Sequence, residues 1–150
     1  MIRFMNINDI NRVADIERKC FKDAPSPLSF DEIAGFIIEP TNINIIDEDS
    51  GAYLIISPIK TANAVYIHRV AIPEDKRGNG VFKSIALYAG KVCSSYGYTS
   101  ALLHVAKENI HAIDTYKNLG FRPIMEALRY YPSGKDALTM QKTLHGMKIK

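Results

Sequence analysis

Residues 64–106 constrain the fold of this chain more than any other stretch. An apolar strand is predicted at 64–72, where it ends at Pro73, and a glycine loop follows it. A long helix is then predicted up to Gly97, because apolar residues recur at helical spacing between the glycine loop and Gly97. The next stretch, SALLHVA, is too apolar to alternate, which predicts a central strand covered on both faces. Strand, helix and strand in succession indicate an α/β protein.

The remainder of the chain fits the same class. A first strand is predicted at 2–7, and a helix through Cys20 is predicted to begin at a cap formed by Asn8 or Asp9. Further elements are predicted as follows: a helix at 30–38 with a capping box of Ser29 and Glu32, a hairpin of strands 42–47 and 52–57, a helix from Asn109 to Gly120, and strands at 121–124 and 137–144. We expect one domain over residues 1–144 with a mixed sheet, and a loose tail at 145–150.

Composition narrows the class of protein. The chain has 150 residues, of which 47% are hydrophobic, and it contains neither a signal peptide pattern nor an apolar run long enough to span a membrane. Cys20 and Cys93 lack any metal-binding or redox spacing, so we expect two reduced thiols, no metal site and a cytoplasmic protein.

Charge points to small anionic or cationic ligands and does not indicate nucleic acid. The net charge is only +3, but residues 64–150 hold 13 of the 19 Lys and Arg and only 6 of the 16 Asp and Glu. An anionic ligand is therefore favoured by the second part of the chain and a cationic one by the first. The alternative is that these charges are simply scattered and solvated.

The glycine loop, RGNGVFKS, is the strongest local candidate for an anion site. A Walker P-loop is excluded because Phe82 stands where glycine must precede Lys83, and a dinucleotide fingerprint is excluded because Lys83 replaces its third glycine. What remains is a helix N-terminus with free N–H groups and basic neighbours, Arg77 among them, which suits a phosphate. The alternative is a tight turn in which glycine only relieves strain.

Two longer stretches carry a resemblance to a known family. The segment YIHRVAIPEDKRGNGVF and the run N-x-x-A-x-x-x-Y-x-x-x-G-F at Asn109–Phe121 resemble the GNAT superfamily of acetyl-coenzyme A-dependent N-acetyltransferases, over about Ile2 to Leu144. The resemblance implies a mostly antiparallel mixed sheet flanked by helices, and acetyl-coenzyme A as the cofactor, with its pyrophosphate in the glycine loop. The cofactor residues that it implies are Val70, Ala71, Ile72, Arg77, Gly78, Asn79, Gly80, Val81, Phe82, Lys83, Asn109 and Tyr116.

One residue departs from the family pattern within the loop. Members usually carry a small residue at the position of Phe82. Its ring is expected either to pack outward along the helix or to crowd the pyrophosphate.

Within the family, the C-terminal half is most similar to protein N-terminal acetyltransferases, including those that act on ribosomal-protein alanine. LRYYPSGKDALTMQKTL is similar to their substrate hairpin, which implies that Tyr130 and Tyr131 lie over the acceptor. CFKDAPSPLSFDEI resembles the loop that forms the opposite wall, with Phe21 and Leu28. The alternative for the tyrosine pair is a half-buried strand end.

Acetyl transfer to an amine needs a proton acceptor for the amine and a proton donor for the departing thiolate. His104, His68 and Tyr66 are the candidate bases and also substrate-binding residues, and period two predicts that Tyr66, His68 and Val70 share one strand face. Prokaryotic relatives typically carry glutamate at the position of His104, whereas some eukaryotic ones have LHV there and a tyrosine matching Tyr66. A lone histidine in an apolar strand is otherwise a satisfied core residue.

Tyr116 matches the family tyrosine beside the cofactor sulfur and is the expected general acid, unless it is only a core aromatic. Asn109 is expected to contact the pantetheine arm, and it also suits a helix cap.

Three functions remain open on this basis. The first is acetylation of a protein or peptide N-terminal α-amine, and the second is acetylation of a small amine such as a polyamine, amino acid or drug. The third is a non-catalytic acyl-coenzyme A sensor, which Phe82 and the missing glutamate motivate. No nucleic-acid or membrane partner is expected, and the protein is expected to be a monomer or a homodimer.

Overall fold

A computed structural model of the chain describes residues 1–24 and 27–144. The tail predicted at 145–150 lies outside the described residues.

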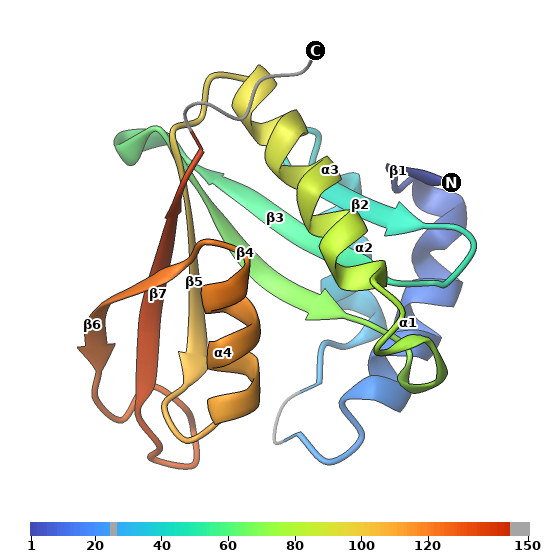
Figure 1. The fold of residues 1–150 in the computed structure, drawn as a ribbon. Coiled ribbons are helices and arrows are strands. Elements are labelled where there is room, and N and C mark those ends of the chain that lie inside the picture. The colour runs from blue at the N-terminus through green and yellow to red at the C-terminus, as the bar shows by residue number, and fades with distance from the viewer. Residues whose placement is uncertain (25–26, 145–150) are drawn as a thin grey trace.

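A seven-stranded sheet in the order β1-β2-β3-β4-β5-β7-β6 forms the centre of the molecule (Figure 1). Strands β4 and β5 pair in parallel, and the other neighbouring strands are antiparallel, which confirms the predicted mixed and mostly antiparallel sheet. The strands are β1 (Ile2–Phe4), β2 (Ile43–Asp47), β3 (Tyr53–Ile59), β4 (Ala64–Ala71), β5 (Ser100–Ala106), β6 (Arg122–Ala127) and β7 (Ala137–Thr143).

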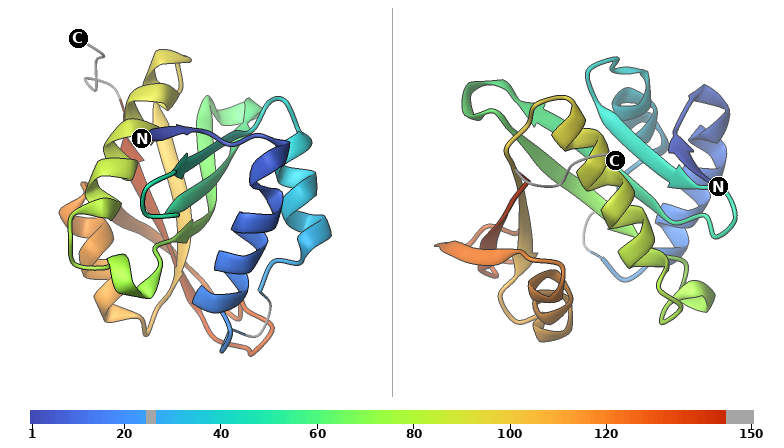
Figure 2. Two further views of the ribbon diagram at one scale, coloured as in Figure 1. Left: turned by 90° about the vertical axis from the view of Figure 1, so that its right-hand side faces the viewer. Right: turned by 45° about the horizontal axis from the view of Figure 1, so that its top comes forward.

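Helices cover both faces of this sheet (Figure 2). The α-helices are α1 (Ile10–Cys20), α2 (Phe30–Ile38), α3 (Val81–Ser95) and α4 (Ile110–Asn118), and the 3-10 turns are η1 (Ile7–Asp9), η2 (Lys60–Ala62) and η3 (Glu74–Lys76). Val13 of α1 and Ile33 of α2 pack on one face, and Ile85 of α3 and Ile113 of α4 pack on the other. None of the helices within residues 1–24 and 27–144 has the length and apolar character that a membrane crossing requires.

The predicted helix ends are confirmed at α2, α3 and α4. The Ser29 hydroxyl accepts from the Glu32 N–H, and the Glu32 carboxylate accepts from the Ser29 N–H, each at 3.1 Å, which completes the capping box. Asn109 Oδ1 accepts from the Ala112 N–H at 3.2 Å and so caps α4. Gly97 has φ +88° beyond the end of α3, a conformation that glycine adopts readily.

The N-cap of α1 is Asp9, one of the two residues predicted, but its side chain makes no cap hydrogen bond to this helix. The chain first makes the turn η1, which Asn6 caps by accepting from the Asn8 N–H. Asp9 is buried and its two oxygens accept from Arg3 at 2.8 Å each. A buried carboxylate needs strong donors, and the Arg3 guanidinium supplies two in parallel. The first strand accordingly ends at Phe4, before the predicted limit.

Strand β5 is central, as predicted, but it is not fully covered on both faces. Its residues alternate between buried and half-buried, with Ala101, Leu103 and Val105 packed toward α3 and α4. The other face, which carries His104, stays half-buried because it borders an open pocket.

Candidate active site

The two parallel strands separate part-way along their length. Residues Ala64–Tyr66 of β4 pair with Ser100–Leu102 of β5, and beyond this point the strands diverge (Figure 1). A pocket of about 130 Å³ lies where they have separated. Its lining residues come from the end of α1, from β4, β5 and α4: Phe21, Ile67, His68, Arg69, Val70, Leu103, His104 and Tyr116.

Four of the predicted site residues lie together beside this pocket. The Tyr66 hydroxyl lies 2.7 Å from His104 Nδ1 and 3.3 Å from the Tyr130 hydroxyl. The Tyr130 ring stacks on the His104 imidazole, with 4.3 Å between ring centroids and 13° between planes. Tyr131 packs edge-on against Tyr130 at 5.0 Å. Side chains from β4, β5 and the loop between β6 and β7 thus form one aromatic cluster.

His68 lies next to this cluster with polar and aromatic partners of its own. Its ring packs against Tyr66 and against Phe36 of α2, each with 4.8 Å between centroids. Its Nε2 lies 2.9 Å from the Ser57 hydroxyl. His68 therefore faces the same side of the sheet as Tyr66, but its polar contact is to Ser57 and not to His104.

Burial shifts the titration of Tyr66 and His104 in opposite directions. Burial lowers the pKa of the His104 imidazole, which is therefore neutral near pH 7, and burial is also the main cause that raises the pKa of the Tyr66 hydroxyl. A protonated phenol donates one hydrogen bond, and Nδ1 at 2.7 Å is its best acceptor here. The pair is thus arranged so that His104 Nδ1 can accept a proton through Tyr66.

The prediction that Val70 shares a face with Tyr66 and His68 is wrong, because β4 contains a bulge, whereas Tyr66 and His68 do share one face. The pairing with β3 shifts register there, with Ile67 opposite Ile56 but Arg69 opposite Ile55. One extra residue, His68, therefore reverses the alternation, as bulges do. Val70 packs toward α3 and α4, whereas Arg69 turns toward α1.

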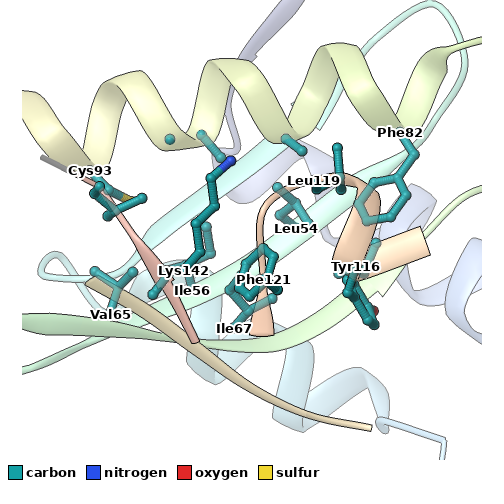
Figure 3. A pocket seen from close by; sticks show the side chains of 16 residues that line it. Leu54, Ile56, Val65, Ile67, Phe82, Cys93, Tyr116, Leu119, Phe121 and Lys142 are labelled. Atoms are coloured by element: carbon teal, nitrogen blue, oxygen red, sulfur yellow. The ribbon is translucent and has the colours of Figure 1, made fainter. Parts of the chain in front are cut away.

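Tyr116 reaches the pocket from α4. Burial raises the pKa of its hydroxyl to about 12, so the group stays protonated at neutral pH and can serve as a proton donor. Its ring meets Phe82 edge-on, with 5.9 Å between centroids. Figure 3 shows Phe82 pointing from α3 toward Tyr116, so the expectation of an outward-packed Phe82 is wrong.

The glycine loop has an open anion-binding geometry. Gly78 and Gly80 have φ of +81° and +77°, and a Cβ at either position would meet nothing within 4 Å. Gly80 is the N-cap of α3 and supplies no side-chain cap, so the first-turn N–H groups are open to a ligand. Lys83 is exposed within that turn, and Arg77 is exposed beside it, with its Nε donating to the Ile72 carbonyl at 2.9 Å.

The other predicted cofactor residues are placed around this loop. Ala71 is buried toward α1 and α2, and the Ile72 carbonyl accepts from Arg77 and contacts Cys20 Sγ at 3.6 Å. Asn79 and Val81 belong to the loop and to the start of α3, and Asn109 is the α4 cap. Their contacts with a cofactor remain predictions.

A buried ionic network holds the outer wall of the pocket. Glu17 of α1 is fully buried; it accepts from the Tyr53 hydroxyl at 2.5 Å and from Arg69 Nη2 at 2.9 Å. It also accepts from the Leu28 N–H at 2.8 Å. The Arg69 guanidinium lies 4.3 Å above the Phe21 ring. One carboxylate thus holds the Leu28 backbone directly, and it holds the Arg69 guanidinium that lies over the Phe21 ring.

Glu17 and Arg69 are site residues that the sequence reasoning did not single out. Glu17 falls on the apolar face of its helix, and a carboxylate at a core position must be paired. This rule could have predicted from the sequence that Glu17 has a buried partner. Arg69 gave no such signal, because simple alternation puts it on the face opposite to Tyr66 and only the bulge brings it to the pocket.

A family model matches most of this chain. Residues 10–121 match the model of the acetyltransferase (GNAT) family, which covers more than half of the chain. None of the curated proteins has a sequence that matches this chain significantly.

Solved structures share the fold over nearly the whole chain. The ribosomal-protein-S18-alanine N-acetyltransferase from Escherichia coli superposes with a TM-score of 0.83 at 20% identity, over 96% of this chain and 93% of that one. Ard1 from Thermoplasma volcanium gives 0.82 at 22% identity, over 95% and 96%. An aminoglycoside 6'-N-acetyltransferase complexed with coenzyme A gives 0.83 at 15% identity, over 96% and 97%.

These neighbours include enzymes named for protein and for small-molecule acceptors, so they show the fold and leave the acceptor open. The family match over residues 10–121 confirms the resemblance read from the glycine loop and the Asn109–Phe121 run. The chain belongs to the GNAT family of acetyltransferases.

Proposed function

We propose that this protein transfers an acetyl group from acetyl-coenzyme A to the α-amine of a protein or peptide N-terminus. The observation that carries the proposal is the 2.7 Å contact between the Tyr66 hydroxyl and His104 Nδ1, beside a pocket bordered by Phe21 and near Tyr130. This arrangement places a group that can take up the proton of the amine next to aromatic side chains that can contact the peptide.

The chain's residues fit the cofactor. The open glycine loop and the uncapped start of α3 would hold the pyrophosphate, with Arg77 and Lys83 adding positive charge. When bound, acetyl-coenzyme A supplies an activated thioester, whose C–S bond breaks as the amide C–N bond forms and coenzyme A leaves as the free thiol. Val70 and Tyr116, which line the pocket, would border the reacting end.

The acid–base chemistry follows from the pKa directions. The Tyr66 hydroxyl passes its own proton to Nδ1 of the neutral His104. As it does so, its oxygen takes a proton from the acceptor ammonium. The Tyr116 hydroxyl, whose pKa is about 12, holds a proton and donates it to the departing thiolate. An α-amine with a pKa of roughly 8 suits this pair better than a lysine amine at roughly 10.4.

The pocket lining favours an acceptor with a single amine. Among the described residues that line it there is no carboxylate, and Arg69 contributes a cation. Polyamines and aminoglycosides carry several positive charges and need carboxylates to compensate for lost hydration. This lining supports a peptide N-terminus over a polycation as the acceptor, and the unpaired Cys20 and Cys93 fit a cytoplasmic setting.

The test is release of free coenzyme A in the presence of acetyl-coenzyme A and a panel of acceptors. The panel contains peptides with different first residues, the same peptides with a blocked α-amine and one free lysine, and spermidine. We expect turnover on the free peptides alone. His104→Gln should lower kcat/KM by about 10²–10⁴-fold, because it removes the proton acceptor.

His111→Gln is the matched control, since His111 is exposed on α4 away from the pocket lining. It should leave kcat/KM unchanged. Turnover confined to spermidine would assign a small amine as the acceptor. Binding of acetyl-coenzyme A without turnover on any amine would assign a sensor, and an unaffected His104→Gln variant would exclude the Tyr66–His104 pair.

A further inference from the structure

We propose that an apolar cavity behind Tyr116 and Phe82 binds the acyl chain of donors longer than acetyl, so that the protein accepts acyl-coenzyme A thioesters of about four to six carbons. This inference rests on the proposed function and concerns the donor at the same site.

The cavity adjoins the pocket between β4 and β5, on the side where these two strands are still paired. It shares Ile67, Val70 and Tyr116 with the pocket lining. It also reaches Val65 and Ala101, which face each other where β4 and β5 are still paired. A chain that extends inward from the pocket, past the point where the strands join, therefore meets this cavity.

Small residues on α3 create the space. Along the face of α3 toward the sheet, the lining residues at positions i, i+3, i+4 and i+7 are Ala86, Ala89, Gly90 and Cys93. None of these side chains fills the distance to β3 and β4. Phe82, one turn before Ala86, points across to Tyr116 at the end of the cavity nearer the catalytic pocket (Figure 3).

The chemistry of the lining matches a short hydrocarbon chain. The residues from β3, β4 and α4 are aliphatic or aromatic, and Leu54, Ile56 and Leu119 are examples. The volume is about 40 Å³, which corresponds to about three water-sized groups or methylenes. Burying each methylene should tighten binding by about fourfold, which is about 0.8 kcal/mol per CH₂.

Among the described residues that line the cavity, Lys142 alone carries a charge. Its side chain points from β7 toward α3, and no carboxylate of residues 1–24 or 27–144 forms an ion pair with it (Figure 3). Its four-carbon stem covers apolar surface and leaves only the amine polar. A succinyl chain, whose terminal carboxylate could pair with that amine, therefore provides the sharpest alternative to a plain aliphatic chain.

The test measures binding directly, by titration calorimetry with acetyl-, butyryl-, hexanoyl-, decanoyl- and succinyl-coenzyme A. We expect the Kd to fall about fifteenfold from acetyl to butyryl, to level off by hexanoyl and to gain nothing at decanoyl, because the cavity is then full. Ala89→Leu fills the cavity from α3; it should remove the gain for butyryl and leave the Kd of acetyl-coenzyme A unchanged. Ala86→Leu is a second filling variant, to be used if Ala89→Leu does not fold.

Lys91→Leu is the matched control, because it adds a leucine to the exposed side of the same helix. It should retain the butyryl gain. Equal or weaker binding of butyryl-coenzyme A, with normal binding of acetyl-coenzyme A, would overturn this inference alone. Succinyl binding tighter than butyryl, and reversed by Lys142→Met, would overturn the aliphatic assignment. Failure to bind even acetyl-coenzyme A would overturn the proposed function as well.

Discussion

A carboxylate without exposed surface, as in Glu17, needs hydrogen-bond donors for both of its oxygens. Tyr53, Arg69 and the Leu28 N–H supply them, and they come from β3, β4 and the loop before α2. The pocket wall is therefore held by a charged group in the core and not only by apolar packing. Removing its charge should weaken the wall and the whole fold together, because the Arg69 cation would lose its partner.

We predict that Glu17→Gln lowers the free energy of unfolding by about 2–4 kcal/mol, because charged hydrogen bonds to a buried group are replaced by weaker ones. Urea denaturation followed by circular dichroism measures this. Asp15→Asn is the control on the same helix: its ion pairs with Arg18 and Lys19 are at the surface, and its loss should cost less than about 1 kcal/mol. Equal losses for both variants would mean that burial of Glu17 does not decide its contribution.

Of the individual site residues, the sequence predicted those that belong to a motif and missed those whose direction depends on strand pairing. The motif around Tyr66 and the LHV stretch indicated two residues that the structure brings to 2.7 Å. Arg69 could not be found in the same way, because the direction of a strand side chain depends on register with the neighbouring strand. That register is set by tertiary pairing at Ile55 and Ile56.

Among the secondary-structure elements, those controlled by local interactions were predictable and the others were not. The capping box of α2 and the cap of α4 involve residues three apart in the chain, so their pattern is visible in the sequence. The turn η1 is an exception: its capping box of Asn6 and Asp9 is equally local, and it was missed because Asn6 was assigned to the first strand. The uneven cover of β5 was missed because it depends on the pocket formed where β4 diverges.

For α2 we predict that Ser29→Ala lowers the free energy of unfolding by about 1 kcal/mol, because the Glu32 N–H loses its acceptor at the helix start. Thermal and urea unfolding provide the measurement. Ser95→Ala is a suitable comparison, since Ser95 lies in the last turn of α3 and donates to the Val92 carbonyl from an exposed position. Its cost should stay within about 0.5 kcal/mol. A Ser29→Ala variant as stable as the parent would show that the cap contributes nothing.

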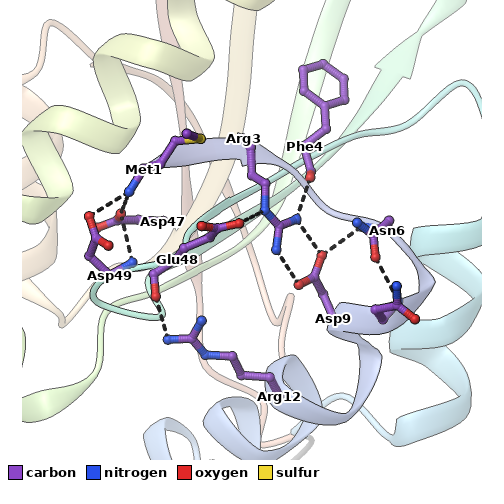
Figure 4. A network of polar contacts seen from close by, with 10 residues as sticks. Met1, Arg3, Phe4, Asn6, Asp9, Arg12, Asp47, Glu48 and Asp49 are labelled. Atoms are coloured by element: carbon purple, nitrogen blue, oxygen red, sulfur yellow. Dashed lines mark hydrogen bonds and ion pairs between the residues drawn. The ribbon is translucent and has the colours of Figure 1, made fainter.

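For the molecule as a whole, a polar network joins the first strand to the rest of the fold. Arg3 bridges Asp9 and Glu48, and Arg12 donates to the Glu48 carbonyl at 2.8 Å (Figure 4). These contacts connect β1, η1, α1 and the hairpin between β2 and β3. Because β1 has only three residues at the sheet edge, this network contributes much of its attachment.

The network makes stability depend on pH. The Arg3 guanidinium holds the pKa of Asp9 below its ordinary value of 3.8, so the contribution of Asp9 is present above that pH and is lost as pH falls through the lower, folded value. At pH 7 we expect Asp9→Asn to be less stable than the parent by about 1–3 kcal/mol. The difference should shrink steadily below pH 4, when urea unfolding is compared at several pH values.

Asp23→Asn serves as the reference for this series, because Asp23 is exposed in the turn after α1. The free energy of unfolding of Asp23→Asn should equal that of the parent at every pH. A gap between Asp9→Asn and the parent that stays constant down to pH 2 would contradict a contribution from the Asp9 charge.

The aromatic cluster around His104 has a consequence for optical spectroscopy. The chain contains no tryptophan and eight tyrosines, and four of these, Tyr66, Tyr116, Tyr130 and Tyr131, lie at or beside the pocket between β4 and β5. Half of the chromophores that dominate the near-ultraviolet spectrum therefore sit where ligands are proposed to bind. These tyrosines are intrinsic chromophores, so near-ultraviolet circular dichroism or tyrosine emission should report ligand binding at the site without any label.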